Sequence, residues 1–310
     1  MILTVTPHTA LDKILFIDKF TPGSVHRTEK FIYSVGGKGL DSSVTLSCLD
    51  VDTVGLVFVA GDTGRTLIEL AERFGITVVP VWVGGETRVA HVISETRIGR
   101  HSHVISGKIL VNAGQLEEFY TLFRKLVLNT AYVICAGSVP TGVPPGFYQQ
   151  ITEIAHQSNV PVLIDSSRQM IIEAIPANPD IIKMNWDEFE STFYQKTPTL
   201  EELKKLAGEI YADYQLNSLV ITCGVDGIIS FSNKGAFHTI VPELKAVNAA
   251  GAGDAASSAL AWRFSEGDNW LAALNWAGAV SSAVVLTPGT AECHMQDVID
   301  LLPKIQTIHI

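Results

Sequence analysis

The sequence predicts a single α/β domain in which helices cover both faces of a mostly parallel sheet, with a small β appendage. The first observation is a regular alternation of helix-like and strand-like segments from residue 116 onward. The second is that the strand-like segments are apolar runs rich in β-branched residues, which is typical of strands buried on both faces. The third is that no linker, low-complexity tract or internal repeat interrupts residues 1–310, so we expect one domain.

The first half of the chain contains two kinds of segment. Residues 2–6 form an apolar strand that ends at Pro7, and the predicted strand 53–59 is flanked by helix-like segments at 40–49 and 63–74. Residues 13–35 and 86–107 instead mix apolar and charged side chains in short runs around turn residues. We expect these two segments to form two-stranded excursions with one polar face, which make up the β appendage.

The second half alternates regularly, and polar or glycine-rich clusters follow its strands. Helices are predicted at 116–128, 147–157 and 255–264, and strands at 132–136, 161–165, 181–184 and 218–222. Ligands of such sheets bind beyond the carboxyl ends of the strands. This shared position predicts one site that collects Asp12, residues 36–39, 137–138, Asp165, Asn185, 222–227 and 251–254. The alternative is that such loops are generally rich in Gly, Asp and Ser.

The segment Gly251-Ala252-Gly253-Asp254 indicates the chemistry most directly. It precedes a helix-forming stretch, so its backbone N–H groups point the same way, with the positive end of the helix dipole behind them. Such a cup suits a phosphate or a developing anion, and Asp254 at its rim is placed to accept a hydroxyl proton. The pattern favours phosphoryl transfer. The structural alternative is an N-capping aspartate in a glycine-rich turn.

Composition excludes several other classes. Acidic residues outnumber basic ones by 32 to 22, a net charge of −10, which argues against a nucleic-acid or membrane-surface binder. No apolar run approaches the ~20 residues that span a bilayer, and the N-terminus lacks the basic region of a signal peptide. Four widely spaced cysteines are typical of reduced thiols in a cytoplasmic protein: Cys48, Cys135, Cys223 and Cys293.

Over nearly the whole chain, the order of these motifs resembles the ribokinase-like PfkB family of carbohydrate kinases. Gly251-Ala252-Gly253-Asp254 resembles the family's C-terminal signature, which implies that Asp254 is the catalytic base and that the amides form an anion hole. Gly36-Gly37-Lys38-Gly39 resembles the N-terminal signature on the sugar side. The family fold is a three-layer αβα sandwich with a β-sheet lid over the sugar, and the lid here is implied at about 13–35 and 86–107.

The resemblance also implies a Mg²⁺-ATP site. Asn185-Trp186-Asp187-Glu188 fits the family's N-x-x-E motif, so Glu188 is implied to hold Mg²⁺ through water. Thr222 to Gly227 resembles the loop along the ATP phosphates, and Ser281-Ser282 falls where the family lines its adenine pocket. The residues implied on the ATP side are Lys183, Asn185, Thr222, Gly224, Gly227, Asn248, Ser281 and Ser282.

Within the family, Thr87-Arg88 and Ala136-Gly137-Ser138-Val139-Pro140 resemble the phosphosugar branch of 1-phosphofructokinase, tagatose-6-phosphate kinase and the minor 6-phosphofructokinase. In that branch the Arg and the Ser hold the phosphate already on the sugar, which suits a guanidinium fork. Arg27 is a third candidate for this phosphate, from across a dimer interface. The alternative for Arg88 is a solvated charge at the start of a lid strand.

Several departures concern the sugar side. His8-Thr9 replaces the usual Asn-Pro, Arg168 stands where Gly is common, and Asp41 replaces the usual Asn. Asp12 and Asp41 are implied to orient sugar hydroxyls, yet a carboxylate cannot donate a hydrogen bond and would repel a phosphate. On the nucleotide side, Asn248-Ala249-Ala250 replaces a run that helps some relatives hold a monovalent cation.

The expected function is ATP-dependent phosphorylation of a sugar phosphate of the fructose-1-phosphate, fructose-6-phosphate or tagatose-6-phosphate class, in a cytoplasmic homodimer paired through the lid. The motifs leave two alternatives. One is a kinase of an unphosphorylated sugar or nucleoside. The other is a non-catalytic sugar- or nucleotide-binding protein of the same fold.

Overall fold

The computed structural model describes the backbone of residues 1–310 and every side chain except that of His101. Its centre is a ten-stranded sheet in the order β14-β13-β12-β11-β10-β9-β8-β1-β4-β5. The strands from β5 across to β11 are parallel to one another, and β12, β13 and β14 are added antiparallel. The predicted α/β class with a mostly parallel sheet is confirmed. The strands are β1 Ile2–Thr6, β4 Thr53–Val59, β5 Thr77–Trp82, β8 Tyr132–Ala136, β9 Val162–Asp165, β10 Ile181–Asn185, β11 Ser218–Thr222, β12 Ile228–Ser232, β13 Gly235–Ile240 and β14 Gln306–His309.

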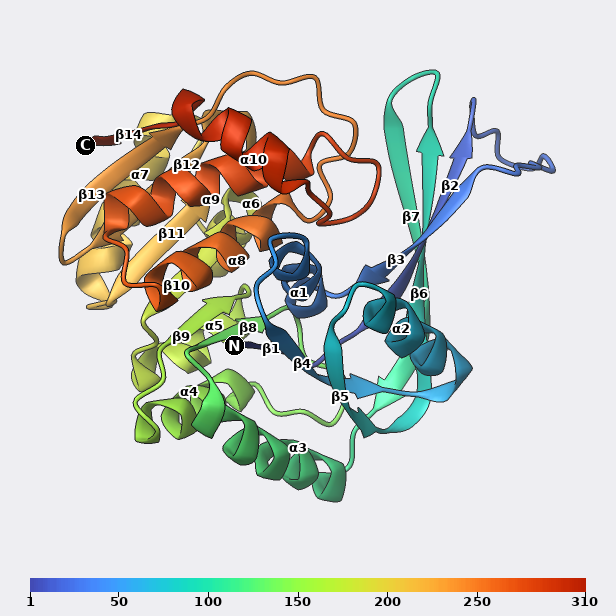
Figure 1. Ribbon diagram of the computed structural model, residues 1–310, viewed down its shortest axis with the longest axis horizontal. Coiled ribbons are helices and arrows are strands. Elements are labelled where there is room, and N and C mark those ends of the chain that lie inside the picture. The colour runs from blue at the N-terminus through green and yellow to red at the C-terminus, as the bar shows by residue number, and fades with distance from the viewer.

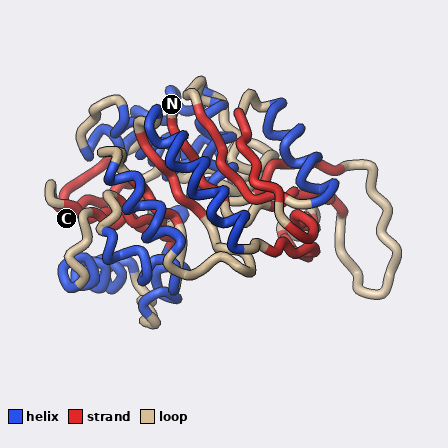
Figure 2. Tube along the Cα trace, turned by 90° about the horizontal axis from the view of Figure 1, so that it is seen from below, coloured by secondary structure: helices blue, strands red, loops and turns tan.

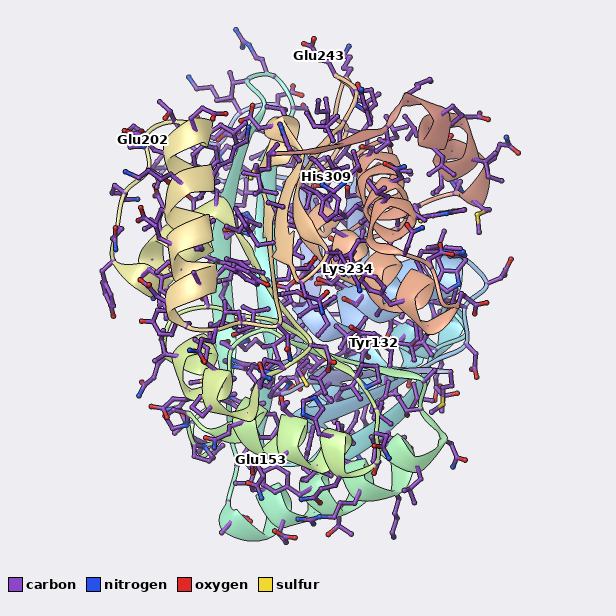
Figure 3. The ribbon with its side chains drawn as sticks, turned by 90° about the vertical axis from the view of Figure 1, so that its left-hand side faces the viewer. Tyr132, Glu153, Glu202, Lys234, Glu243 and His309 are labelled. Atoms are coloured by element: carbon purple, nitrogen blue, oxygen red, sulfur yellow. The ribbon has the colours of Figure 1, made fainter. Side chains whose placement is uncertain are left out.

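Helices cover both faces of this sheet (Figure 3), with α7, which carries Glu202, on one side and α8, α9 and α10 on the other. The α-helices are α1 Lys38–Cys48, α2 Gly61–Arg73, α3 Ala113–Leu126, α4 Phe147–Gln157, α5 Gln169–Ala174, α6 Trp186–Phe193, α7 Leu200–Asp213, α8 Ala252–Ser265, α9 Trp270–Val284 and α10 Met295–Leu301. Four short 3₁₀ turns occupy Val127–Asn129, Ile175–Ala177, Gly224–Asp226 and Leu302–Lys304.

The apolar runs of the strands supply two cores at once because successive side chains of a strand point to opposite faces. In β8, Val133 and Cys135 pack into the core beneath α3 to α7. Ile134 of the same strand packs into the core beneath α8 and α9. Burial of one such aliphatic side chain is worth about 1.5–3 kcal/mol. Because helices cover both faces of the sheet, its strands are continuously apolar rather than alternating between apolar and polar residues.

A separate four-stranded sheet stands beside the main body (Figure 1) and forms the lid sheet, in the order β3-β2-β6-β7. Its strands are β2 Ala10–Ile17, β3 Phe31–Gly36, β6 Gly84–Glu95 and β7 Arg100–Leu110. The two predicted excursions join through a parallel β2/β6 pair in which Arg88 lies opposite Ala10. Figure 2 shows the loop between β2 and β3, residues 18–30, standing clear of the body.

Two sequence-level observations were tested by the fold. The four cysteines are free thiols. Among the helices that the structure describes, none combines the length and the apolar character that crossing a membrane requires.

Candidate active site

Two cavities open at the carboxyl ends of the parallel strands and adjoin at Lys38, whose side chain lines both. The first cavity, of about 560 Å³, lies between the lid sheet and the main sheet, and its predicted site residues are Asp12, Gly37, Lys38, Asp41, Arg88, Ser138 and Glu188. The second cavity, of about 430 Å³, contains Lys183, Asn185, Thr222, Gly224, Gly227, Gly251, Ala252, Gly253, Asp254, Ser281 and Ser282. The loops predicted to gather at the strand ends thus do so.

The first turn of α8 lines the second cavity. Gly251 is its N-cap, with a left-handed φ of 83°, and a side chain there would collide with the backbone of Ala291. The helix begins at Ala252 rather than at the predicted residue 255, so Asp254 belongs to its first turn. The first N–H groups of a helix have no partner within it. The Ala252 N–H donates to the Ala249 carbonyl oxygen at 3.3 Å. The N–H groups of Gly251, Gly253 and Asp254, hereafter the amide cup, are left available at the second cavity with the helix dipole behind them.

Asp254 has the protonation behaviour expected of a general base. Its side chain is buried, and its Oδ1 has no hydrogen-bond partner among the described residues. Burial and the neighbouring carboxylate of Asp165 raise the pKa of Asp254 to about 7, although Lys38 and Lys183 oppose the shift. At neutral pH the carboxyl group is therefore divided between its base and acid forms, which suits proton transfer.

This shift predicts the pH dependence of activity. A raised pKa means that Asp254 is protonated below about pH 7, and only the ionised form can accept a proton. We expect kcat/KM to rise tenfold per pH unit below about 7 and to level off above it, because kcat/KM reports groups of the free enzyme. A pH–rate profile between pH 5 and 9, with stability checked at each end, measures this. Activity that falls as pH rises from 5 to 7 would remove Asp254 from the base role.

Asp165 is the centre of an ion network beneath the amide cup. Its Oδ1 lies 2.8 Å from Lys38 Nζ and its Oδ2 lies 2.8 Å from Lys183 Nζ. Burial opposes its ionisation, but the two lysines prevail and lower the pKa of Asp165 to about 2. Lys183 Nζ lies so close under Gly253 that a Cβ there would be 2.8 Å away. The Lys183 charge is thus fixed behind the amide cup.

On the sugar side, Asp12 and Asp41 behave differently from the expected pair of carboxylates. Burial raises the pKa of Asp12 to about 7, although the Arg88 charge opposes it. Burial, together with the charges of Asp254 and Asp12, holds the pKa of Asp41 well above its usual range. This shift favours the neutral acid form of Asp41, which can donate a hydrogen bond and does not repel a phosphate as the ionised form would. Gly36 lies outside the cavity lining. Its lack of a side chain leaves room for Asp12, because a Cβ at residue 36 would lie only 2.5 Å from Asp12 Oδ1.

Arg88 and Ser138 both line the first cavity and both contact His8. Arg88 Nη2 donates to the His8 carbonyl oxygen at 2.8 Å, and Ser138 Oγ lies 3.1 Å from His8 Nδ1. Burial and the Arg88 charge lower the pKa of His8 to about 4, so the ring is neutral. Arg27 is exposed on the 18–30 loop and lines neither cavity in the single chain.

Two further residues predicted on the nucleotide side, Asn185 and Asn248, have different positions: Asn185 lines the second cavity, and Asn248 stabilises a nearby loop. Asn185 caps α6 by accepting from the Glu188 N–H at 2.8 Å, while Glu188 accepts from the Asn185 N–H at 3.0 Å and from Lys38 Nζ at 2.6 Å. Asn248 is not part of the lining. Its amide instead donates to the carbonyl oxygens of Pro288 and Gly289, which braces the loop before α8.

Asp165 was predicted to lie at the site as one of the strand-end clusters, but without a role, and His8 and Arg168 were noted only as departures from the family pattern. Asp165 is the last residue of β9, so the strand-end rule was a sufficient signal for it. His8 and Arg168 line the first cavity. Arg168 has a left-handed φ of 54°. No sequence pattern predicts such a backbone conformation for an arginine.

Comparison with known proteins agrees with this geometry. A family model described as pfkB family carbohydrate kinase matches residues 4–297. The chain is 27% identical over 310 residues to a D-tagatose-1-phosphate kinase of Bacillus licheniformis, covering 100% of both chains. It is 26% identical to a 1-phosphofructokinase of Vibrio cholerae, covering 98% of this chain and 96% of that protein. A solved structure of a possible 1-phosphofructokinase from Thermotoga maritima superposes with a TM-score of 0.90 at 22% identity, covering 100% of this chain and 99% of that chain.

Proposed function

The chain belongs to the pfkB family of carbohydrate kinases, and from that premise we propose that it transfers the γ-phosphoryl group of ATP to a hydroxyl of a sugar phosphate. The family makes it a phosphotransferase with an alcohol group as acceptor. The substrate class that we propose is fructose-1-phosphate, fructose-6-phosphate or tagatose-6-phosphate. The observation that carries the proposal is that two cavities adjoin at Lys38, the first lined by several charged and hydroxyl-bearing side chains and the second containing the amide cup and Asp254.

The second cavity suits ATP at both of its ends. Val241, Leu244 and Val285 line it and offer an apolar wall to a planar base. The amide cup, backed by Lys183, offers donors and positive charge to the phosphates. A nucleotide bound in this direction would present its terminal phosphate to the first cavity.

Asp254 is then the group that takes the proton of the attacking hydroxyl. Its unpartnered Oδ1 is free to accept that proton, and the amide cup stabilises the negative charge on the transferring phosphoryl group. Lys38 lines both cavities. It is therefore placed to stay close to the negatively charged phosphoryl group while that group passes from one cavity to the other. Asp12 and the neutral acid of Asp41 would orient sugar hydroxyls as acceptor and donor.

The residues present fit Mg²⁺ held largely by water and phosphates. No group of three or more His, Cys, Asp or Glu among the described residues is arranged to hold a metal ion. Mg²⁺ in kinases usually keeps several waters and uses one or two carboxylates, and Glu188 at the junction of the cavities offers one. When bound, Mg²⁺ neutralises charge on the phosphates.

We expect ADP release to require Mg²⁺, ATP and the sugar phosphate together. ADP release without the sugar phosphate would contradict the proposal.

Arg88 and Ser138 are the residues that we propose for the phosphate already on the sugar. A guanidinium and a hydroxyl converge there beside a neutral His8 ring. The relatives named for tagatose-1-phosphate and 1-phosphofructokinase activity support a phosphosugar substrate.

We also propose that the chain forms a homodimer through the lid sheet. Phe31, Tyr33 and Val104 of the lid sheet are 49%, 43% and 57% exposed, and a small sheet with open edges is marginal alone. We expect light scattering to give twice the 33.5 kDa chain mass at micromolar concentration. Val104→Asp should shift the mass to that of a monomer, whereas Leu128→Asp, an exposed residue outside the lid, should not. A wild-type monomer with full activity would contradict this proposal.

A further inference from the structure

The backbone of Arg168 adopts a conformation that side chains normally avoid. Its φ of 54° is combined with a ψ of −136°, whereas Tyr194, with a φ of 54° and a ψ of 34°, adopts the ordinary left-handed conformation. Only glycine enters the region of Arg168 without strain. The surroundings hold this turn in place, because the Arg168 N–H donates to Thr192 Oγ1 at 2.6 Å and that hydroxyl donates to the Glu188 carbonyl oxygen at 2.6 Å. Strain of this kind concentrates at functional sites.

The Arg168 side chain lines the first cavity. Among the described lysines and arginines of that lining, it is the one whose charge is not already engaged. Lys38 is paired with Asp165 and Glu188. Arg88 faces Asp12 and donates to backbone carbonyl oxygens. Among the side chains that the structure describes, no carboxylate lies within ion-pairing distance of Arg168. A strained, exposed arginine without an anionic partner therefore stands at the edge of a cavity proposed to take an anion.

The turn that carries Arg168 is fixed beside the loop that carries Ser138. Ser166 Oγ donates to the Gly137 carbonyl oxygen at 2.9 Å, and the Tyr148 hydroxyl donates to the same oxygen at 2.8 Å. Arg88 reaches the cavity from β6 of the lid sheet, whereas Arg168 reaches it from the N-terminus of α5 in the main body. A group bound at Ser138 thus has one arginine on the lid side and another on the body side.

We propose that Arg168 is a specificity-determining residue that, with Arg88, binds the phosphate carried by the sugar; this inference rests on the proposed phosphosugar function. A phosphate monoester carries close to two negative charges at neutral pH, and the engaged Arg88 can balance only part of that charge. A second guanidinium adds charge-assisted hydrogen bonds, which are the strong ones. The free energy gained by binding the phosphate then offsets the backbone strain of Arg168, a strain that only glycine avoids at this position.

The test uses Arg168→Gly, Arg168→Gln and Arg168→Lys in the full chain, with kinetics on fructose-1-phosphate, fructose-6-phosphate, tagatose-6-phosphate and the parent sugars. Loss of a charge-assisted hydrogen bond should raise KM for the preferred sugar phosphate about tenfold to hundredfold in the Gly and Gln variants. We expect kcat to change less than about threefold, because this binding is shared by ground and transition states. The Lys variant should keep part of the affinity.

Stability separates this role from a structural one. Glycine relieves the strain at residue 168, so Arg168→Gly should leave Tm unchanged or raise it by up to about 4 °C while KM rises. The matched control is Gln215→Gly, since Gln215 is an exposed residue with a φ of 51° that lines neither cavity. We expect that variant to leave KM for every substrate unchanged.

Three outcomes would overturn the inference. The first is an unchanged KM in Arg168→Gly and Arg168→Gln. The second is an equal loss for the sugar phosphate and its parent sugar, which would place Arg168 away from the phosphate. In both cases a wild-type preference for sugar phosphates that Arg88→Ala abolishes would leave the proposed function intact. The third is a wild-type enzyme that phosphorylates only unphosphorylated acceptors, which would overturn the proposed function as well.

Discussion

Asp254→Asn is expected to lower kcat by about 10²–10⁴, the usual effect of losing a general base. The amide keeps nearly the size of the carboxyl group but cannot take up the hydroxyl proton. ATP binding should stay within a few-fold, because the amide cup and Lys183, rather than the Asp254 carboxylate, face the phosphates in the proposed arrangement. Single-turnover ADP formation and equilibrium ATP binding measure the two effects separately.

Stability provides the control for this variant. Burial raises the pKa of Asp254 from 3.8 to about 7, which means that the folded protein loses stability as pH rises between these two values and that the loss is complete above about pH 7. Replacing it with a neutral amide should therefore not lower Tm at neutral pH. Asp213→Asn, at the end of α7 and away from both cavities, should leave kcat and Tm unchanged. A loss of less than tenfold in a folded Asp254→Asn protein would show that another group is the base.

Arg88→Ala is expected to weaken a sugar phosphate about tenfold to hundredfold more than its unphosphorylated parent, because charge-assisted hydrogen bonds are worth roughly 1.5–3 kcal/mol. The effect should appear mainly in KM, with little change in kcat, since Arg88 would hold the phosphate alike in ground and transition states. Steady-state kinetics on both acceptors give the ratio. Arg88→Lys keeps the charge but not the fork, so it should recover only part of the affinity.

The Arg88 guanidinium also donates to the carbonyl oxygens of His8 and Thr9, so some loss that is common to both acceptors is expected from the loosened loop. The additional loss of affinity for the sugar phosphate over that for its parent sugar is what tests the phosphate role of Arg88. Arg73→Ala, an exposed arginine in the last turn of α2, should change neither acceptor. Equal losses for the sugar phosphate and its parent would place Arg88 away from the phosphate and favour a kinase of unphosphorylated sugars.

Much of the fold could be predicted from local pattern. Strands such as β1 and β8 are continuous apolar runs, and a parallel sheet covered on both faces requires that pattern. The antiparallel β12, β13 and β14 were not predicted. In β13, exposed and buried residues mix, so the strand has no such run. The start of α8 was placed three residues late, because Gly251-Ala252-Gly253 has the composition of a loop. In the structure only Gly251 is outside the helix.

The site could be predicted as a position but not as an electrostatic arrangement. Residues that follow successive strands had to converge, which brought Ser138, Asn185 and Asp254 to the same edge, whereas Asp12 reaches the site from within lid strand β2. The protonation of Asp41 depends on Asp254 and Asp12, which are distant in sequence. The same holds for Lys183, whose ammonium group is held at 2.8 Å by Asp165 of the neighbouring strand β9.

Arg27 and Arg168 mark the limits of sequence reasoning about the phosphate. Arg27 was selected through family resemblance, yet its exposed position on the 18–30 loop gives it a role only if a second chain brings it to the site. Arg168 was noted only as a departure from glycine. Its significance comes from its backbone conformation and its place in the first cavity, which only the folded chain defines.

The central claim is that the two adjoining cavities transfer a phosphoryl group from ATP to a sugar phosphate. The most direct measurement is ADP release by the wild-type protein with Mg²⁺-ATP over a matched set of ketohexose phosphates and their parent sugars. We expect turnover with at least one sugar phosphate, at a kcat/KM at least tenfold above that of its parent sugar. Turnover only with unphosphorylated sugars or nucleosides would contradict the substrate class. Tight ATP and sugar binding without ADP release from any acceptor would contradict the catalytic role altogether.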